Sequence, residues 1–455
     1  MIVRARTFSR LALAATLASP LLHANGRFPA AGHLLVGPGE SDGSFVLRTT
    51  FGLALTTDRG ARWSWVCEEA LGAVGEFDPT TALASDGAIT LGLPDGLRVS
   101  TVDRCGWSAP AGSMARVLDV TQSATGEVLL AAAGAFVEGA TPYSVVLRSR
   151  DGGRSWTLAA RLDRFFVETV DLAPRDPTRV YVSGANAEAR PTILRSNDGG
   201  DRFAPVAATL PSNATPYLAA VSRTNPDRLW VRTTEGLGSG LYRSDDGGAS
   251  LTRVAASAAP MTGFAVSDDD RRVWWGTSER GSGMQRSVDG APFARVGPPI
   301  AVRCLRFHRD TLFVCADEAS DGYSLGWSRD LGETVAPWMS LRDLQGPLPG
   351  CGDGGVSGRC EAPWATLGPR LRDLDAATAP ARVPLDPPDA GGDAASDAPD
   401  DEVTLDAAAA RDVGSPAPTP AAGCACAARG NARGSAPGGI ALAALARRRR
   451  RRRRG

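Results

Sequence analysis

The sequence contains no lysine and only three histidines, His23, His33 and His308, among its 455 residues. So few histidines argue against an imidazole-based zinc site and against a nucleophile activated by histidine. The formal net charge is zero, because a C-terminal run of arginines offsets an acidic stretch before it. The rest of the chain is mildly acidic, so it offers no positive field that would attract nucleic acid.

Aromatic residues make up 6% of the chain, yet ten of them are tryptophans, and glycine and proline number 52 and 32. Abundant turn-forming residues together with tryptophan suit many short strands better than long helices. The composition therefore predicts an all-β protein.

The N-terminus has the order of a secretory signal peptide. Three arginines precede the apolar segment LALAATLASPLL, and the small residue Ala24 stands at the expected cleavage point. We therefore expect residues 1–24 to direct export. Because exported proteins meet an oxidising environment, the cysteines are candidates for disulfide bonds.

One short motif recurs along the chain with a nearly constant spacing. Its clearest copy is LRSRDGGRSWTL at residues 147–158, and the aspartates of successive copies lie 41 to 48 residues apart. A period of about 40–50 residues with four strands per unit is typical of a β-propeller. The seven aspartates are Asp58, Asp103, Asp151, Asp198, Asp246, Asp289 and Asp330.

Each repeat also contains a strand, a tight polar turn and a second strand before the aspartate motif, as in TVDLAPRDPTRVYVSG. Adding the strands on either side of the motif gives four strands per repeat. We therefore predict a seven-bladed β-propeller of four-stranded antiparallel blades over residues 27–345. A closed ring leaves only short, protected strand edges.

The spacing Ser/Thr-x-Asp-x-Gly-x-Ser/Thr-Trp resembles the Asp-box, or BNR, repeat, and Ser149, Asp151, Gly153, Ser155 and Trp156 match it at every position. The resemblance implies that the boxes lie at the blade periphery, away from the central channel where ligands usually sit. In such a turn the aspartate accepts backbone hydrogen bonds, the glycine adopts a positive φ, and the tryptophan packs on a neighbouring blade. Because a residue repeated seven times cannot be a unique catalytic group, we expect these aspartates to be structural.

Proteins with this repeat have several functions. Sialidases need an arginine triad, a Tyr–Glu pair and an acidic aspartate, whereas the five tyrosines here lie in no recognisable context. Xyloglucanase-like enzymes use two facing propellers, whereas this sequence predicts a single propeller. It most resembles single propellers of the photosystem II stability-factor or sortilin-like kind, whose members bind proteins. The resemblance implies a non-enzymatic binding or assembly module for a protein or glycan, without cofactor or metal; the alternative is a glycoside hydrolase of sialidase or xyloglucanase type.

Three charged residues on predicted inner strands, Glu168, Asp171 and Arg306, are candidates for the lining of the channel. Ion pairing with neighbours is the alternative interpretation of these charges. The acidic run at 267–272 invites a cation-binding interpretation, but it lies at the predicted strand–turn–strand position and is better interpreted as an exposed turn.

Six cysteines before the C-terminal tail predict three disulfides. Cys304 and Cys315 are predicted to lie directly opposite each other on the two arms of a hairpin. A Cys67–Cys105 bridge would join neighbouring blades. A Cys351–Cys360 bridge would close a glycine-rich loop within a cap segment, residues 346–369.

Residues 370–422 are rich in alanine, proline and aspartate, which predicts a disordered spacer. Residues 423–455 begin with a Gly-Cys-x-Cys sequence, in which Cys424 and Cys426 are candidates for lipidation, and continue with an apolar segment and an arginine run. This order resembles a myxobacterial C-terminal sorting tail, which implies surface display and peripheral membrane association. The apolar segment is far shorter than the ~20 residues that span a bilayer.

Overall fold

The computed structural model describes residues 28–37, 43–73, 77–114, 116–135, 142–374 and 380–385. The chain divides into two compact units, residues 1–390 and 391–455, and every described residue belongs to the first. The predicted signal peptide, most of the predicted spacer and the tail with Cys424 and Cys426 lie outside the described residues.

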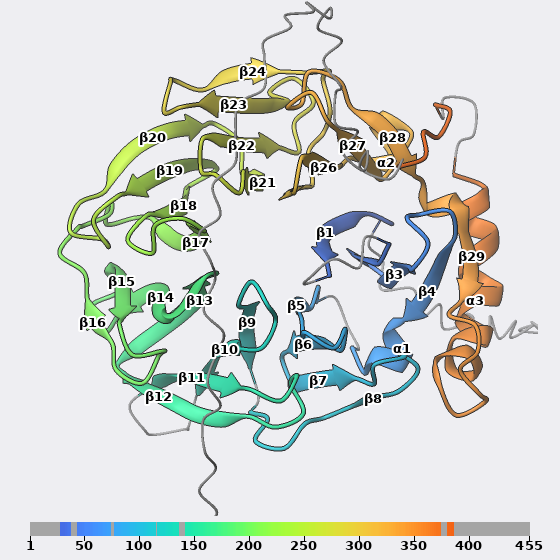
Figure 1. Cartoon of the computed structure of the whole chain (residues 1–455), viewed down its shortest axis with the longest axis horizontal. Coiled ribbons are helices and arrows are strands. Elements are labelled where there is room, and N and C mark those ends of the chain that lie inside the picture. The colour runs from blue at the N-terminus through green and yellow to red at the C-terminus, as the bar shows by residue number, and fades with distance from the viewer. Residues whose placement is uncertain are drawn as a thin grey trace, which may run out of the picture. The chain divides into compact units, whose positions relative to one another are not determined.

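The first unit contains seven antiparallel four-stranded blades, each built from consecutive strands and arranged around a centre (Figure 1). Blades 1 to 4 contain β1 (Ala31–Val36), β2 (Phe45–Thr49), β3 (Gly52–Thr56), β4 (Trp63–Cys67); β5 (Thr80–Leu83), β6 (Ile89–Leu93), β7 (Gly96–Ser100), β8 (Trp107–Ser108); β9 (Val117–Gln122), β10 (Leu129–Ala135), β11 (Tyr143–Ser149), β12 (Thr157–Asp163); β13 (Phe165–Ala173), β14 (Asp176–Asn186), β15 (Pro191–Ser196) and β16 (Ala204–Pro205).

Blades 5 to 7 continue the same order and are followed by a C-terminal segment. They contain β17 (Thr215–Val221), β18 (Leu229–Glu235), β19 (Gly238–Ser244), β20 (Thr252–Ser257); β21 (Met261–Val266), β22 (Arg272–Thr277), β23 (Met284–Val288), β24 (Ala294–Val296); β25 (Cys304–His308), β26 (Thr311–Cys315), β27 (Leu325–Ser328) and β28 (Ala336–Met339). The predicted fold of seven four-stranded blades is confirmed.

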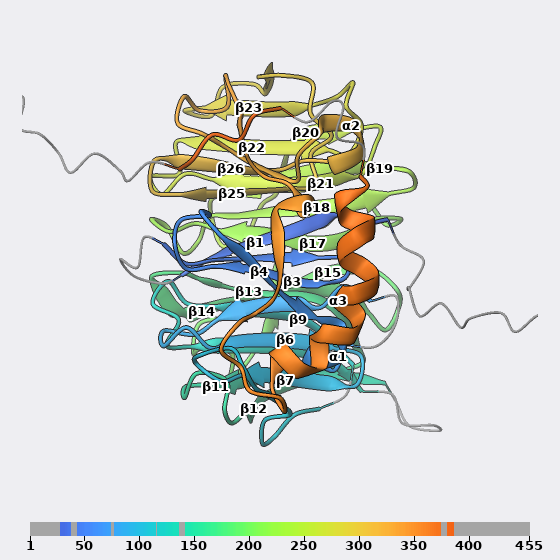
Figure 2. The same cartoon turned by 90° about the vertical axis from the view of Figure 1, so that its right-hand side faces the viewer.

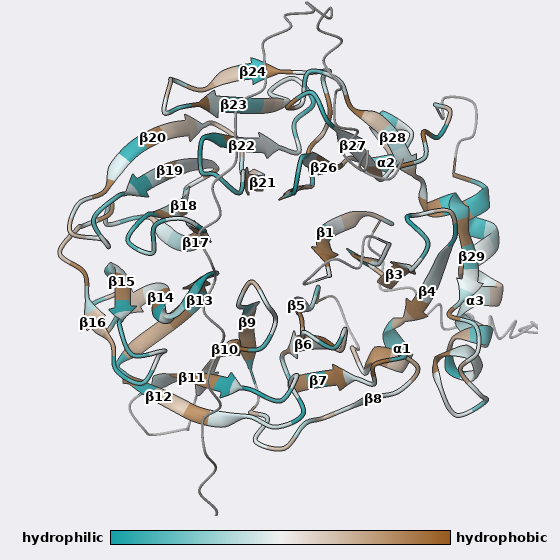
Figure 3. Ribbon diagram, viewed as in Figure 1, coloured by the Kyte–Doolittle hydropathy of each residue, from teal (hydrophilic) through white to brown (hydrophobic). Residues whose placement is uncertain are grey.

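The middle strands of the blades are buried on both faces, since each blade is covered by its two neighbours. Every residue of β3, β6 and β26 is buried, and these strands read as continuous apolar or small residues rather than as an alternating pattern. Figure 3 shows hydrophobic residues along inner and middle strands and hydrophilic residues along parts of the outer strand β20. The core therefore lies between the blades as a set of layers.

The repeated aspartate closes the turn between the third and fourth strands of its blade. The Asp151 carboxylate accepts hydrogen bonds from the Ser149 hydroxyl at 2.8 Å and the Ser155 backbone N–H at 2.9 Å. Gly153, with φ of 84°, donates its N–H to Ser149 Oγ. Trp156 is buried among residues of blades 2 and 3. The same hydrogen bonds between backbone and hydroxyl occur at Asp58, Asp198, Asp246 and Asp330.

Two copies of the motif depart from this turn. Asp103 accepts from the Thr101 hydroxyl and from the backbone N–H of Cys105. Asp289 instead forms two hydrogen bonds with Arg271, at 2.6 and 3.0 Å. Ala291 stands where the complete turns have a glycine of positive φ, so the turn expected at Asp289 is replaced by a different one, in which Ala291 donates its N–H to a carbonyl at 3.0 Å.

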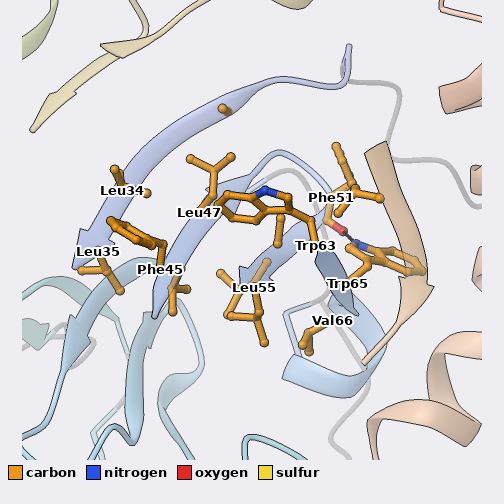
Figure 4. Packing of buried hydrophobic residues seen from close by; sticks show 14 of the residues in the cluster. Leu34, Leu35, Phe45, Leu47, Phe51, Leu55, Trp63, Trp65 and Val66 are labelled. Carbon is orange, nitrogen blue, oxygen red and sulfur yellow. Dashed lines mark hydrogen bonds between the residues drawn. The ribbon is translucent and has the colours of Figure 1, made fainter. Parts of the chain in front are cut away.

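The ring closes without strand exchange between blades 1 and 7 among the described strands. Aromatic side chains fill the interface instead: Trp338 of blade 7 packs edge-on against Phe45 and Trp63 of blade 1, with ring centroids 4.9 and 5.5 Å apart. The Trp338 indole also donates a hydrogen bond to the carbonyl of Arg59 at 3.2 Å. Figure 4 shows the blade 1 part of this core, with Phe45 and Trp63 among the leucines.

After blade 7 the chain returns along the outside of blade 1. The 3₁₀ helix η1 (Leu341–Asp343) leads into β29 (Leu344–Pro347), which pairs in parallel with β4, and α3 (Val356–Arg372) covers the outer edge (Figures 1 and 2). Trp364 of α3 packs on Trp65 with ring centroids 5.6 Å apart. We call residues 341–372 the strap. Two short helices, α1 (Glu68–Leu71) and α2 (Glu318–Asp321), lie within blades 1 and 7.

The strap is attached by disulfides that differ from two of those predicted. The Cys304–Cys315 pair is confirmed, and its residues are directly opposed across β25 and β26. The Cys67–Cys105 and Cys351–Cys360 predictions are wrong, because the observed bridges are Cys67–Cys360 and Cys105–Cys351. The parallel pairing of β29 with β4 carries the strap past the ends of blades 1 and 2, so each strap cysteine faces a blade cysteine rather than its neighbour in sequence.

We predict that the strap contributes much of the stability of the closed ring. Replacing Cys351 and Cys360 together by serine should lower the free energy of unfolding by about 2–5 kcal/mol for each bridge lost. Urea denaturation measures this loss, and serine replacement of Cys304 and Cys315, which are 11 residues apart, is the matched control with a smaller expected loss. Equal losses in both variants, or peptide mapping without reductant that finds the strap cysteines bonded to each other, would contradict the assignment.

Candidate functional site

The inner strands of all seven blades line a central channel with a volume of 450 Å³. Strands β1, β5, β9, β13, β17, β21 and β25 each contribute residues to its wall (Figure 1). A volume of this size lies within the range of small-molecule sites. The channel is therefore the candidate site.

Two aspartates of the channel wall hold neighbouring inner strands together. Asp119 on β9 accepts the backbone N–H of Val170 on β13 at 3.0 Å. Asp171 on β13 accepts the Thr121 hydroxyl of β9 at 2.9 Å and also a backbone N–H of Val221 on β17. Blades 3, 4 and 5 are thus joined around the channel by side-chain oxygens.

These two carboxyls titrate in different ranges. Burial raises the pKa of Asp119 to about 8, and the negative charge of Asp171 adds to the rise. Burial also raises the pKa of Asp171, but only to about 6. Hydrogen bonds from Thr121 and backbone N–H groups and the charge of Arg306 favour the ionised form and oppose the effect of burial. At neutral pH Asp119 is therefore protonated and Asp171 is mostly ionised.

Arg306 on β25 faces the same channel and is half-buried. Its Nε atom is buried without a hydrogen-bond partner. Among the residues that the structure describes, no hydrogen bond or ion pair within 4.0 Å engages its guanidinium. The predicted channel position of Asp171 and Arg306 agrees with the structure, but they act on each other only through space.

The two histidines of the channel wall are neutral. Burial, together with the smaller effects of the Arg48 and Arg306 charges, lowers the pKa of His33 to about 3. Burial followed by the charges of Arg306 and Arg309 lowers the pKa of His308 to about 4. His33 Nδ1 lies 2.9 Å from the Thr81 hydroxyl oxygen, which joins blades 1 and 2.

Glu168, the third predicted channel residue, lies on β13 but outside the set of residues that lines the cavity. Burial raises its pKa. Its charge in turn raises the pKa of Tyr217, after the larger effect of burial, and the Arg232 guanidinium stacks 4.8 Å from the Tyr217 ring centroid. Glu168 therefore belongs to a separate polar cluster between blades 4 and 5.

The acidic run at 267–272 forms a hydrogen-bonded turn as expected, but the expectation that it is exposed is wrong for Ser267 and Asp270, which are buried. Asp269 accepts from the Ser267 hydroxyl and the Arg271 N–H, and the Asp270 carboxylate accepts from the hydroxyls of Ser222 and Thr224. No cluster of three or more potential metal ligands occurs among the described residues. The run acts as a connector between blades 5 and 6.

A second cavity of 510 Å³ lies between blades 5 and 6, where the sixth aspartate turn departs from the others. Its wall includes Trp230, Phe293 and Asp289. Phe293 packs against Trp275 of its own blade, with ring centroids 6.2 Å apart, and against a core cluster that includes Trp230 of blade 5.

Sequence reasoning missed Asp119. It lies two residues before Thr121 on an inner strand, so the period-2 alternation of a strand places both side chains on the channel face. This alternation is the sequence signal that identifies Asp119 as a channel residue. It was not used in the prediction, because Asp119 lies outside the repeated motif. An acid paired with a base of lower pKa is the arrangement that acid–base catalysis uses.

The buried neutral form of Asp119 predicts a pH-dependent stability. A carboxyl whose folded pKa lies above its unfolded value stabilises the fold fully below the unfolded pKa and loses that contribution as pH rises through about 8. Relative to Asp119→Asn, which does not titrate, the wild type should lose about 4 kcal/mol between pH 5 and pH 8.5. Urea denaturation at both pH values measures the difference, and a constant gap between the two proteins would refute the assignment.

Comparison with known proteins gives limited similarity. No family model matches the chain. A xyloglucanase of Paenibacillus sp. is 26% identical over 238 residues, which is 50% of this chain and 22% of the relative, so the chain spans about a fifth of that protein's length. None of the described helices is long and apolar enough to cross a membrane.

Three solved structures are similar to part of the chain at low identity. The GH74 enzyme of Niastella koreensis is 12% identical with a TM-score of 0.38, covering 68% of this chain and 65% of that one. The GH74 xyloglucanase of Xanthomonas campestris is 17% identical with a TM-score of 0.32, covering 68% and 64%. An extracellular domain of a putative one-component system of B. thetaiotaomicron is 13% identical with a TM-score of 0.46, covering 66% and 38%.

Proposed function

We propose that this chain is an exported propeller that binds a glycan in its central channel without hydrolysing it. The carrying observation is the channel of 450 Å³, walled by all seven inner strands, with polar groups of Asp171 and Arg306 facing it. Its three carboxyls, Asp119, Asp171 and Asp270, all accept hydrogen bonds from a neighbouring blade, so none is a free group placed beside a scissile bond. These features support recognition rather than turnover.

A glycan is better supported than a protein as the ligand. The similar Paenibacillus protein is named a xyloglucanase, and the shared 238 residues fall within a chain that forms one propeller. The channel is narrow and polar, which suits a chain of hydroxylated rings better than a protein surface. The resemblance to Asp-box repeats is consistent with either ligand.

Glycoside hydrolysis is the second candidate. The unlike pKa values of Asp119 and Asp171 favour it, since a glycosidase needs one protonated and one ionised carboxyl. The name of the Paenibacillus relative favours it too. Against it stand the hydrogen bonds that fix both carboxyls to neighbouring strands.

One experiment separates the two functions. The purified propeller, residues 25–385, should bind members of a glycan array but release no new reducing ends from xyloglucan oligosaccharides. Isothermal titration and a reducing-end assay measure the two properties. Asp171→Asn should weaken binding roughly tenfold through loss of a charge-assisted hydrogen bond. Turnover that is lost in Asp119→Asn and Asp171→Asn would establish the hydrolase instead.

We further propose that the protein is displayed at the cell surface. Three disulfides support an oxidising compartment. The C-terminal sequence at 423–455 is the proposed sorting signal, and the chain before it the spacer. Deleting residues 423–455 should move the protein from the cell surface to the culture medium, as immunoblots of both fractions would record; undiminished surface retention would exclude the tail as the anchor.

A further inference from the structure

Arg306 is a cation without a counter-ion in the wall of the channel. Its Nε is buried and unpartnered, and no described residue forms a hydrogen bond or ion pair with the guanidinium. Arginine cannot lose its proton in a protein, so burial lowers its pKa without removing its charge. Its side chain is half-buried, so this charge is only partly removed from water, and an anion that entered the channel would pair with it.

The acidic groups near Arg306 are engaged elsewhere. Asp171 attracts it through space, but that carboxylate accepts hydrogen bonds from Thr121 and from backbone N–H groups. Asp268 pairs with Arg223 at 3.3 Å. Asp119 is protonated at neutral pH, since burial raises its pKa to about 8. The channel therefore contains a donor that its own side chains leave unsatisfied.

Donor and acceptor groups face the channel from different blades. Arg306 on blade 7 donates only, whereas ionised Asp171 on blade 4 accepts only. The wall also includes the small residues Ala220 and Ala265, which leave room for a ligand. A ligand matching both groups carries an anionic acceptor at one point and hydroxyl donors at another.

We propose that the channel binds an acidic saccharide, whose anionic group pairs with Arg306 and whose hydroxyls donate to Asp171. This proposal rests on the glycan-binding function proposed above and names the ligand class. Carboxylate and sulfate groups share the required chemistry, because both present two or more oxygens to the guanidinium fork. The pairing is non-covalent and needs no cofactor.

The test uses three probes of equal length: an oligogalacturonate of three residues, its methyl ester, and a sulfated trisaccharide. The ester keeps the ring hydroxyls and removes the charge. Titration calorimetry with the purified propeller should give roughly 10- to 100-fold weaker binding for the ester than for the matching acid. The comparison between carboxylate and sulfate probes identifies which anion the site prefers.

Variants of Arg306 complete the test. Arg306→Gln should abolish the preference for the acid over the ester, and Arg306→Lys should keep part of it because the charge remains. Arg295→Gln is the matched control, since Arg295 is exposed on the outer strand β24. Because Arg306 has no partner to lose, Arg306→Gln should unfold at the same temperature as the wild type or higher.

Two outcomes would overturn the proposal, and they are distinguishable from failure of the broader function. Equal binding of acid and ester by the wild type would leave glycan binding intact and remove the role of Arg306. A marked fall in the unfolding temperature of Arg306→Gln would reveal a structural partner and remove it as well. Absence of binding to any neutral or acidic saccharide would reject the glycan-binding function itself.

Discussion

Everything in this structure depends on the contact between the first blade and the last. The four strands of each blade are consecutive, and among the described strands no strand of blade 7 joins the sheet of blade 1; only β29, which follows blade 7, adds to that sheet as a fifth strand. The aromatic packing of Trp338 against Phe45 and Trp63 does so from within. The strap does so from outside, by running from blade 7 along β4 and bonding to blades 1 and 2 through disulfides. An apolar interface between the two blades and a strap that adds β29 and two disulfides therefore hold the ring closed.

The closure of the ring determines the shape of the channel. Its wall combines His33 of blade 1 with Arg306 of blade 7, which come together only when the ring is shut. Between these ends, hydrogen bonds that Asp119 and Asp171 accept from neighbouring strands fix the spacing of blades 3 to 5. These polar side chains thus maintain the cavity, so Asp119 and Asp171 are structural residues as well as part of the candidate site.

The period of the aspartate motif predicted the blade number because each turn is local: Asp151 bonds to residues within four positions of itself. The Cys304–Cys315 bridge was predictable for the same reason, since a short hairpin fixes both residues. Cys67 and Cys360 are 293 residues apart, and they meet because β29 adds to blade 1 in parallel. No local pattern signals that addition. Asp119 was not predicted as a channel residue because it lies outside the repeated motif.

The strap holds the ring closed at a distance from the channel. Since α3 and the two disulfides lie on the outer edge of blades 1 and 2, the closing interactions do not occupy the channel. The inner strands are then free to differ between blades, as they do at Thr121, Asp171 and Arg306, while the aspartate turn keeps its hydrogen bonds in five of the seven blades. A ring that disulfides and aromatic contacts hold closed can tolerate the destabilisation caused by one half-buried, unpaired arginine in its wall. The residues that differ from blade to blade are therefore the ones in which a specific ligand would be recognised.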